Sequence, residues 1–327
     1  MPRTGGGNPF KTAGLRAALS SVRMRIGIDL GGTKIEAIVL DEGGTEIGRR
    51  RVASPRGDYA ATLLALKQLV VDFERDLGPI RSVGLGHPGA ISPATGLIKN
   101  ANATWLNGQP LGADSTRMLE RPVRLANDAD CFALSEATDG AAAGAGIVFG
   151  VIIGTGTGGG IVVDGRLLSG ANAIAGEWGH NALPRPQASE WPGPPCYCGR
   201  TGCVETFLSG PGLARDYSTS GGTEVTAQDV VARANAGESL AAECLTRYID
   251  RMARALAAVV NVLDPHVIVL GGGLSKVAQL YERVPQVWTR YIFSDHVSTR
   301  LVPPAHGDAS GVRGAAWLTH NDDPVSR

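Results

Sequence analysis

One order of elements occurs twice in this sequence, and the duplication limits the folds that the chain can adopt. Residues 25–30 alternate between apolar and other side chains, turn at two glycines and alternate again, which predicts antiparallel strands. A further strand at 46–49 and a helix over 58–77 follow. From residue 147 the order recurs as an apolar strand, a glycine turn, a second strand, helices and a buried strand at 267–270. We therefore predict two similar α/β domains that face a cleft.

The length of 327 residues accommodates two domains of roughly 150 residues each. We place a small first domain at 24–126 and a larger second domain at 127–310, with the last helix returning so that 311–327 joins the first. Residues 1–23 contain glycines, prolines and basic side chains but no acid, and Met24 directly precedes the first strand. This segment is predicted to be a disordered tail or the product of a start codon assigned too early.

The charges and cysteines of the chain exclude several classes of protein. Lys and Arg number 31, as do Asp and Glu, so a formal net charge of zero provides no long-range attraction to nucleic acid or a membrane surface. No apolar run approaches the ~20 residues that span a bilayer. Three of the five cysteines lie in one short segment, which favours a metal site and a reducing compartment over a disulfide framework. We expect a cytoplasmic protein without nucleic-acid or membrane partners.

Two stretches fit the dinucleotide-binding pattern G-x-G-x-x-G, at 84–89 and 154–159, but neither has the required context. That pattern places a pyrophosphate on the N-terminus of a helix that follows the glycines. A strand follows the second stretch, and Pro88 leads the first into a loop. The chain also lacks the pattern G-x-x-x-x-G-K-[ST]. Neither a Rossmann dehydrogenase nor a P-loop NTPase is therefore expected.

Both glycine turns are instead predicted to bind phosphate as hairpins. Glycines let backbone N–H groups approach an anion, while threonine adds a hydroxyl and lysine a charge. Each turn alone could be no more than a tight turn, but two of them at matching places in a repeat favour function. The candidates are Gly31, Gly32, Thr33 and Lys34 in the first turn, and Gly154, Thr155 and Gly156 in the second. Asp29, at a strand end, is suited to hold Mg²⁺ through water, and Gly272 and Gly273 would let a flat ring lie against the backbone.

A cluster of sulfur ligands predicts a zinc site. Cys196, Cys198 and Cys203 lie on a short loop, and His180 upstream supplies a fourth ligand. Three thiolates and one imidazole saturate Zn²⁺, so the site is structural rather than hydrolytic. The alternative, three free buried thiols, is uncommon at this spacing. Cys131 and Cys244 are expected to be core residues.

Two acids, Glu177 and Glu205, flank this predicted metal loop. A metal-pinned loop would hold both carboxylates rigidly, as recognition of several hydroxyl groups requires. His180 could bind zinc through one ring nitrogen and present the other N–H to a substrate oxygen. In isolation, either acid would be read as a solvated surface residue.

Asp128, preceded by Asn127, ends an extended stretch just before a helix. By themselves the two residues would be read as a helix N-cap. In a cleft between phosphate-binding domains, however, a carboxylate is needed to accept the proton of an attacking hydroxyl. Asp128 is the best candidate for that base, with Asn127 as its hydrogen-bonding neighbour.

Together these motifs resemble the ROK family of bacterial sugar kinases and repressors, in order from Met24 to about Leu318. Within the family, residues 100–108, 196–199 and 205–207 are most similar to the fructokinase, or manno(fructo)kinase, branch. The resemblance implies an actin/hexokinase-like ATPase fold, built from duplicated ribonuclease H-like domains, and usually a homodimer.

The same resemblance implies the ligands and their residues. ATP and Mg²⁺ would lie between the domains on the two glycine turns, with adenosine near Gly272 and Gly273 and Asp128 as the base. The sugar contacts implied are Gly89, Asn102, Asn127, Glu177, His180 and Glu205. His87 departs from the family pattern, in which an apolar residue is common, and its role is open.

The activity that the resemblance implies is ATP-dependent phosphorylation of fructose at the 6-hydroxyl, with mannose and glucose as further acceptors. An N-acetylglucosamine or N-acetylmannosamine kinase, or a glucokinase, would use the same acids and the same zinc, so these residues cannot separate the alternatives. A sugar-sensing repressor would need a helix-turn-helix ahead of the first hairpin. The 23 residues before Met24 are too few and too interrupted for that module.

Overall fold

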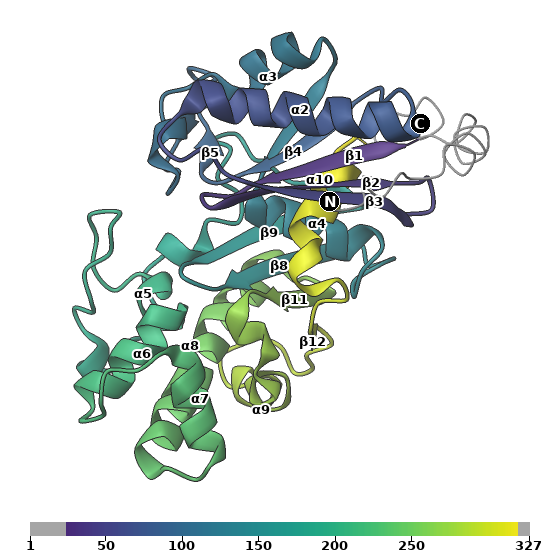
Figure 1. Ribbon diagram of the computed structural model, residues 1–327. Coiled ribbons are helices and arrows are strands. Elements are labelled where there is room, and N and C mark those ends of the chain that lie inside the picture. The colour runs from purple at the N-terminus through teal and green to yellow at the C-terminus, as the bar shows by residue number, and fades with distance from the viewer. Residues whose placement is uncertain (1–23, 320–327) are drawn as a thin grey trace, which may run out of the picture. The chain divides into compact units, whose positions relative to one another are not determined.

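The computed structural model describes residues 24–319, and the contacts within it divide the chain into two compact units (Figure 1). Among the described residues, unit 1 contains 24–131 and 311–319, and unit 2 contains Phe132–Ser310. The prediction of a disordered tail at 1–23 lies outside the described residues. Within residues 24–319, no helix has the length and apolarity needed to cross a membrane.

Unit 1 is built on a five-stranded mixed sheet in the order β3-β2-β1-β4-β7. The first three strands form the predicted antiparallel meander, and β4 and β7 continue the sheet parallel to β1. The strands are β1 (Arg25–Leu30), β2 (Lys34–Leu40), β3 (Glu46–Ala53), β4 (Val83–His87) and β7 (Val123–Asn127). A small hairpin of β5 (Ala90–Ile91) and β6 (Ile98–Lys99) lies outside this sheet.

Helix α2 (Tyr59–Leu77) begins where the sequence predicts, because the Asp58 carboxylate accepts a hydrogen bond from the backbone N–H of Ala61 at 2.9 Å. Its apolar residues at helical spacing are buried against the sheet, among them Leu66 and Phe73. The other helices of the unit are η1 (Thr104–Leu106), α3 (Leu111–Leu119) and the C-terminal part of α10 (Ser310–Trp317).

Two glycines let α10 pack directly on the sheet of unit 1. A Cβ atom on Gly84 would lie 1.6 Å from the carbonyl oxygen of Ala315, and one on Gly27 would lie 2.3 Å from the backbone nitrogen of Ala316. Backbone atoms cannot move aside as a side chain could. The last helix therefore packs on β1 and β4 only because both strands carry glycine there.

Unit 2 repeats the sheet of unit 1 with the same topology, in the order β10-β9-β8-β11-β12. Antiparallel pairing joins β10, β9 and β8, and parallel pairing joins β8, β11 and β12. The strands are β8 (Ile147–Ile153), β9 (Thr157–Val163), β10 (Arg166–Leu167), β11 (Val267–Gly271) and β12 (Arg300–Val302). The duplication read from the sequence is thus confirmed at the level of strand order.

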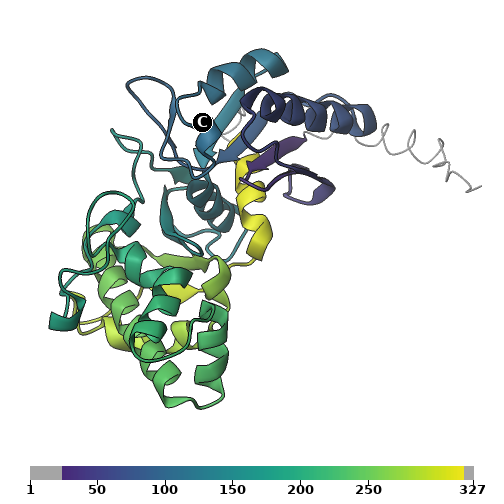
Figure 2. The same cartoon turned by 60° about the vertical axis from the view of Figure 1, so that its left-hand side comes forward.

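The helices of unit 2, drawn in green, gather on one side of its sheet (Figure 2). They bury one large apolar core with the strands, centred on the long helix α8. The helices are α5 (Val204–Leu208), α6 (Gly210–Thr219), α7 (Ala227–Asn235), α8 (Ser239–Leu263) and α9 (Ala278–Trp288), with short turns η2 (Trp178–His180), η3 (Ala188–Glu190), η4 (Gly273–Lys276) and η5 (Gly307–Ala309). Helix α4 (Asp128–Thr138) begins in unit 1 and ends in unit 2.

Candidate active site

The first glycine turn joins β1 to β2 and leaves its backbone accessible. Gly31 donates its N–H to the carbonyl oxygen of Lys34 at 3.0 Å, and a Cβ atom on Gly32 would meet no atom within 4 Å. Thr33 is exposed at the tip. The Lys34 ammonium lies 3.2 Å from the Glu36 carboxylate, which holds the lysine beside the turn. This open, glycine-lined turn, with the Lys34 ammonium beside it, is suited to bind an anion.

Asp29 and Asp128 lie at the ends of β1 and β7, the two strands on either side of β4 in the sheet of unit 1. Asp29 pairs in register with Gly86 of β4, and β4 pairs in turn with β7, which ends directly before Asp128. Burial, and next the negative charge of Asp128, raise the pKa of Asp29 from 3.8 to about 6. The structure therefore brings together the two carboxylates that the sequence analysis assigned to Mg²⁺ and to the base.

Asn127 orients the start of α4 and also connects it to Gly89. Its side-chain oxygen accepts from the N–H of Ala129 at 2.7 Å, as an N-cap does, and its amide nitrogen donates to the carbonyl oxygen of Gly89 at 2.8 Å. Asp128 also accepts from the N–H of Ala129, at 2.9 Å. Asn127 is therefore a helix N-cap, and this role is compatible with its predicted role as the hydrogen-bonding neighbour of the base.

Gly89 lies against the loop that carries Asn102. Its φ is +74°, and a Cβ atom there would lie 2.6 Å from the backbone nitrogen of Ala101. Asn102 is exposed beside Ala101, whose backbone N–H and carbonyl are both bonded by the Asn107 side chain at 2.9 and 3.0 Å. Asn107, which was not singled out from the sequence, holds this loop in place.

His87 is a buried core residue on β4. It is 1% exposed, and its Nδ1 lies 3.1 Å from the carbonyl oxygen of Pro88. Burial lowers the pKa of its imidazole, which favours the neutral form. Within the described residues, these observations indicate packing rather than ligand contact.

Arg56 is a residue near the first turn that sequence reasoning missed. Its Nε donates to the carbonyl oxygen of Gly32 at 3.1 Å, and the N–H of Ser54 donates to the carbonyl oxygen of Thr33 at 3.0 Å. The only signal available was a basic residue just after a strand, and it is the β2–β3 pairing that brings this residue to the turn.

The second glycine turn, between β8 and β9, carries a carboxylate against it. Gly154 donates to the carbonyl oxygen of Gly156 at 2.9 Å, and the N–H of Thr157 donates to Glu205 Oε2 at 2.9 Å. A Cβ atom on Gly156 would lie 2.6 Å from the same carboxylate oxygen. Glu205 is therefore fixed beside the predicted phosphate turn, whereas Thr155 is exposed at the tip.

The four predicted zinc ligands converge. One ligand atom from each of His180, Cys196, Cys198 and Cys203 lies within 4.8 Å of all the others. His180 Nδ1 is 3.6 Å from the Cys196 sulfur, and the sulfurs of Cys198 and Cys203 are 3.6 Å apart. Zinc bonds of ~2.3 Å to sulfur and ~2.0 Å to nitrogen place the corners of a tetrahedral site roughly 3.5–3.8 Å apart. The donor set and its spacing thus fit a closed Zn²⁺ site.

The other ring nitrogen of His180 already has a neighbour. Nε2 lies 2.9 Å from the Tyr197 hydroxyl, and the two rings meet edge to face at 5.1 Å. The sequence analysis gave this nitrogen to a sugar oxygen, and in this structure Tyr197 occupies its hydrogen-bonding position. Cys131 and Cys244 are fully buried core residues, as expected.

Residues 181–203, which we call the metal loop, fold back on themselves through backbone bonds. Leu183 donates to the carbonyl oxygen of Gly202 at 2.9 Å, and Val204, just past the loop, donates to that of Asn181 at 2.8 Å. These bonds place His180 and α5, which carries Glu205, at the base of the loop. Glu177 is exposed directly before η2.

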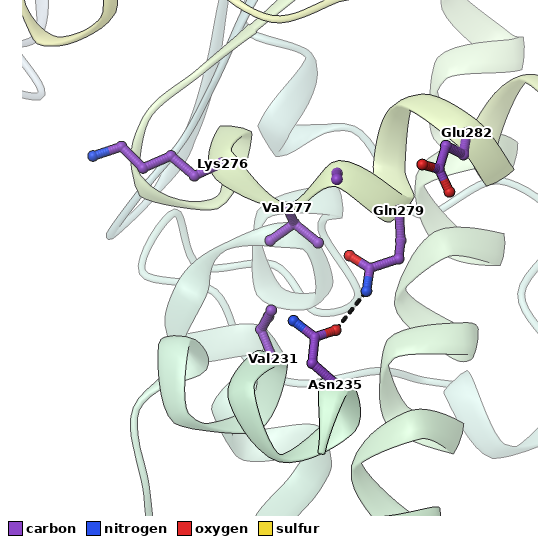
Figure 3. Close-up of a pocket in the computed structure, with 7 residues that line it drawn as sticks. Val231, Asn235, Lys276, Val277, Gln279 and Glu282 are labelled. Carbon is purple, nitrogen blue, oxygen red and sulfur yellow. Dashed lines mark hydrogen bonds between the residues drawn. The ribbon is translucent and has the colours of Figure 1, made fainter. Parts of the chain in front are cut away.

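A cavity of about 350 Å³ in unit 2 adjoins the turn that follows β11. Gly272 has a φ of +81° in that turn, and a Cβ atom on Gly273 would lie 3.3 Å from Gln228 Nε2 on α7. Asn235 and Gln279 face each other across the cavity, with their side-chain amides hydrogen-bonded at 2.5 Å (Figure 3). The lining residues are Val231, Asn235, Lys276, Val277, Ala278, Gln279 and Glu282.

The duplicated mixed sheet, each copy with a glycine turn after its first strand, defines the actin/hexokinase-like class of ATPase folds. Within that class, the chain belongs to the ROK family, whose model matches residues 25–322. A ROK hexokinase from Thermus thermophilus superimposes with a TM-score of 0.82 at 30% identity, covering 91% of this chain and 98% of that one.

Two further relatives bear on ligands. An N-acetyl-D-glucosamine kinase from Yersinia pseudotuberculosis (serotype O:1b, strain IP 31758) is 40% identical over 299 residues, covering 90% of this chain and 98% of the relative. A ROK family glucokinase from Streptomyces griseus, solved in complex with glucose and AMPPNP, superimposes with a TM-score of 0.73 at 25% identity, covering 91% of this chain and 99% of that one.

Proposed function

We propose that this chain phosphorylates the 6-hydroxyl of N-acetyl-D-glucosamine with ATP. The coarser assignment is plain: the chain is a carbohydrate kinase of the ROK family, a transferase that uses ATP and Mg²⁺. The acetamido sugar is supported by the kinase that is 40% identical over 98% of its own length. The expectation of fructose finds no such support, and the N-acetylhexosamine alternative fits this relative better.

The proposed chemistry is supported mainly by one observation: the candidate base and its neighbours lie together at the strand ends of unit 1. Asp128 would accept the proton of the sugar hydroxyl as its oxygen attacks the terminal phosphorus of ATP. Asn127 and Gly89, already joined by a hydrogen bond, would orient the sugar beside this base. Backbone N–H groups of the first turn, with Lys34, would stabilise charge on the phosphoryl oxygens.

The second unit would contribute to both substrates. Glu205 and Glu177 are proposed sugar contacts. His180 is a third, and its Nε2 would exchange the Tyr197 hydroxyl for a sugar oxygen. The second glycine turn is a proposed phosphate contact. The adenosine would lie near Gly272 and Gly273, where α7 also brings Gln228 close.

Two metals belong to this proposal. Asp29 would hold Mg²⁺ through water, and the ion would supply charge neutralisation on the phosphates. His180, Cys196, Cys198 and Cys203 would hold Zn²⁺, which would supply rigidity and no open coordination position. A homodimer and a cytoplasmic location remain predictions.

An ADP-release assay across N-acetyl-D-glucosamine, N-acetyl-D-mannosamine, glucose, mannose and fructose tests the substrate. We expect the highest kcat/KM for N-acetyl-D-glucosamine, with phosphate on oxygen 6 by nuclear magnetic resonance. A higher kcat/KM for fructose would restore the first expectation, and a higher value for another sugar would reassign the substrate.

Asp128→Asn tests the base. We expect kcat to fall by about 10²–10⁴-fold, because an amide cannot accept the proton, while calorimetry still detects sugar binding. Asp72→Asn, an equal charge change on α2, serves as the control and should leave kcat unchanged. A kcat for Asp128→Asn close to that of the wild type would refute the assignment.

A further inference from the structure

Two arginines of α8 are buried with a glutamate of the metal loop. Arg251 is 6% exposed, Arg254 is 3% exposed and Glu190 is 5% exposed. Charged side chains are seldom buried to this extent unless they are paired. All three lie outside the four metal-ligating residues, and the proposed reaction does not use them.

Glu190 receives both arginines at one carboxylate oxygen. Arg251 Nε and Arg254 Nη2 lie 2.7 and 2.9 Å from its Oε1, and its Oε2 accepts from the N–H of Gln187 at 2.8 Å. More than 60 residues of chain separate the glutamate from each arginine. The carboxylate thus anchors the middle of the metal loop to α8.

Arg254 also bonds the backbone near the start of the loop. Its Nη1 donates to the carbonyl oxygens of Pro184 and Arg185 at 3.1 and 2.8 Å, and its Nε pairs with Asp250 at 2.9 Å. Arg185 has a φ of +48°, an uncommon conformation for a residue with a side chain. Arg254 therefore holds a turn that the loop sequence alone would not favour.

Arg251 extends the same network to the helix that carries Glu205. Its guanidinium lies 5.1 Å from the centre of the Phe207 ring in α5, and its Nη1 pairs with Asp216 of α6 at 3.2 Å. Helix α5 starts directly after Cys203, the last metal-ligating residue. Arg251 therefore contacts the metal loop through Glu190 and also contacts, through Phe207, the helix that carries Glu205.

We propose that Glu190, Arg251 and Arg254 are positioning residues, which hold the metal loop in its ligand-binding form even without metal. The metal would then fill a site that α8 has already shaped, and the proposed sugar contacts Glu177, His180 and Glu205 would depend on α8 as well as on the metal. The part of this inference that concerns the sugar rests on the proposed function. The part that concerns the loop does not.

Glu190→Gln is the first variant, because glutamine keeps the shape and one acceptor oxygen but loses the charge that attracts both arginines. Arg254→Lys is the second and keeps a charge without the planar fork that reaches two carbonyl oxygens. Arg247→Met is the matched control: Arg247 lies on the same helix and pairs with Asp216 at 3.1 Å, but it contacts α6 and not the metal loop.

Hydrogen exchange of the metal-free proteins decides the first part. After treatment with a chelator, the wild type should retain protection at the amide of Leu183 and at that of Gly202, which donates to the carbonyl oxygen of Pro194 at 2.9 Å. Both loop variants should lose this protection at least tenfold. The control should retain it. If the metal-free wild type exchanges these amides as fast as the variants do, the metal rather than α8 shapes the loop and the proposal is wrong.

Zinc release and kinetics decide the second part. From zinc-loaded protein, transfer to a coloured chelator should be about 10–100-fold faster in both loop variants than in the control. The KM for N-acetyl-D-glucosamine should rise in the loop variants, while the KM for ATP stays unchanged. If the zinc release rates are equal and the KM for the sugar is unchanged, with only a lower melting temperature, then Glu190, Arg251 and Arg254 stabilise the fold but do not position the metal loop. If no sugar is phosphorylated at all, the proposed function fails, and hydrogen exchange still tests the loop.

Discussion

Asp29 lies in surroundings that disfavour its own ionised form. Burial and the nearby charge of Asp128 raise its pKa from 3.8 to about 6, so the folded protein binds this proton more tightly than the unfolded chain does. The ionised carboxylate therefore lowers the free energy of unfolding. This cost is absent below the unfolded pKa of 3.8, grows as the pH rises, and is complete above about 6.

Asp29→Asn should consequently raise the free energy of unfolding and lower the kinase activity. We expect the free energy of unfolding at about pH 7.5 to rise by up to about 3 kcal/mol, and the gain to shrink as the pH falls toward 4. The kcat should fall, because an amide is a poorer partner for a hydrated Mg²⁺ ion. Urea denaturation across pH, together with the kinase assay, measures both effects. A variant that is less stable than the wild type at neutral pH would show that the ionised Asp29 carboxylate does not lower the free energy of unfolding.

A substitution at Gly32 tests whether the first glycine turn binds phosphate or is only a turn. A Cβ atom there meets no protein atom within 4 Å and its φ is not in the left-handed region, so Gly32→Ala should leave the melting temperature unchanged. A methyl group would nevertheless occupy the space that a phosphate needs against the backbone. We expect the KM for ATP to rise about tenfold with no change in stability, a loss of roughly 1.4 kcal/mol of binding.

Gly43→Ala in the neighbouring turn is the control for Gly32→Ala, because its Cβ atom would also have room, with its nearest contact at 3.5 Å. Both turns should tolerate alanine structurally, and only the first should affect ATP. Equal KM values for ATP in the two variants would favour the simpler reading, in which the first hairpin is only a turn.

At the scale of elements, the contact between α10 and the sheet of unit 1 depends on the absence of side chains. Gly84→Ala would place a methyl group 1.6 Å from the carbonyl oxygen of Ala315, so the helix or the strand must shift. We expect a loss of about 1–3 kcal/mol in the free energy of unfolding, or failure to fold. Gly43→Ala again provides the comparison, and urea denaturation is the measurement. A neutral result would mean that α10 does not pack on β4 as closely as described.

The elements themselves could be predicted because their signals are local. Alternation over a few residues, the Asp58 cap before an amphipathic stretch, and glycine pairs between strands each act within about one turn of chain. The three cysteines are local in the same way, since one loop of the chain brings their sulfurs together. His180 could be added because a tetrahedral metal needs a fourth ligand.

At the scale of the whole molecule, removing the proposed metal should make the metal loop less stable but leave its backbone hydrogen bonds, which the contacts with α8 hold, and the rest of the fold intact. We expect chelation to lower the melting temperature by several degrees and to raise the KM for the sugar, with the circular dichroism of the helices unchanged. Cys198→Ser should reproduce the effect without a chelator. Identical melting temperatures with and without chelator, and no zinc by elemental analysis, would show that these four residues bind no structural metal.

The amino-acid sequence by itself determined the duplicated α/β plan, the glycine turns, membership of the ROK family and the four residues, His180, Cys196, Cys198 and Cys203, whose ligand atoms converge in the structure. It could not determine that Glu205 bonds Thr157, that Arg56 reaches Gly32, or that two arginines of α8 hold Glu190, because those partners lie 48, 24 and more than 60 residues apart. Local signals describe the conformation of neighbouring residues, whereas such contacts exist only once strand order and helix packing have brought distant segments together. The proximity of Asp29 to Asp128 has the same origin: β4 pairs with both β1 and β7, and this pairing brings two acids that are 99 residues apart in the chain close enough for their charges to interact.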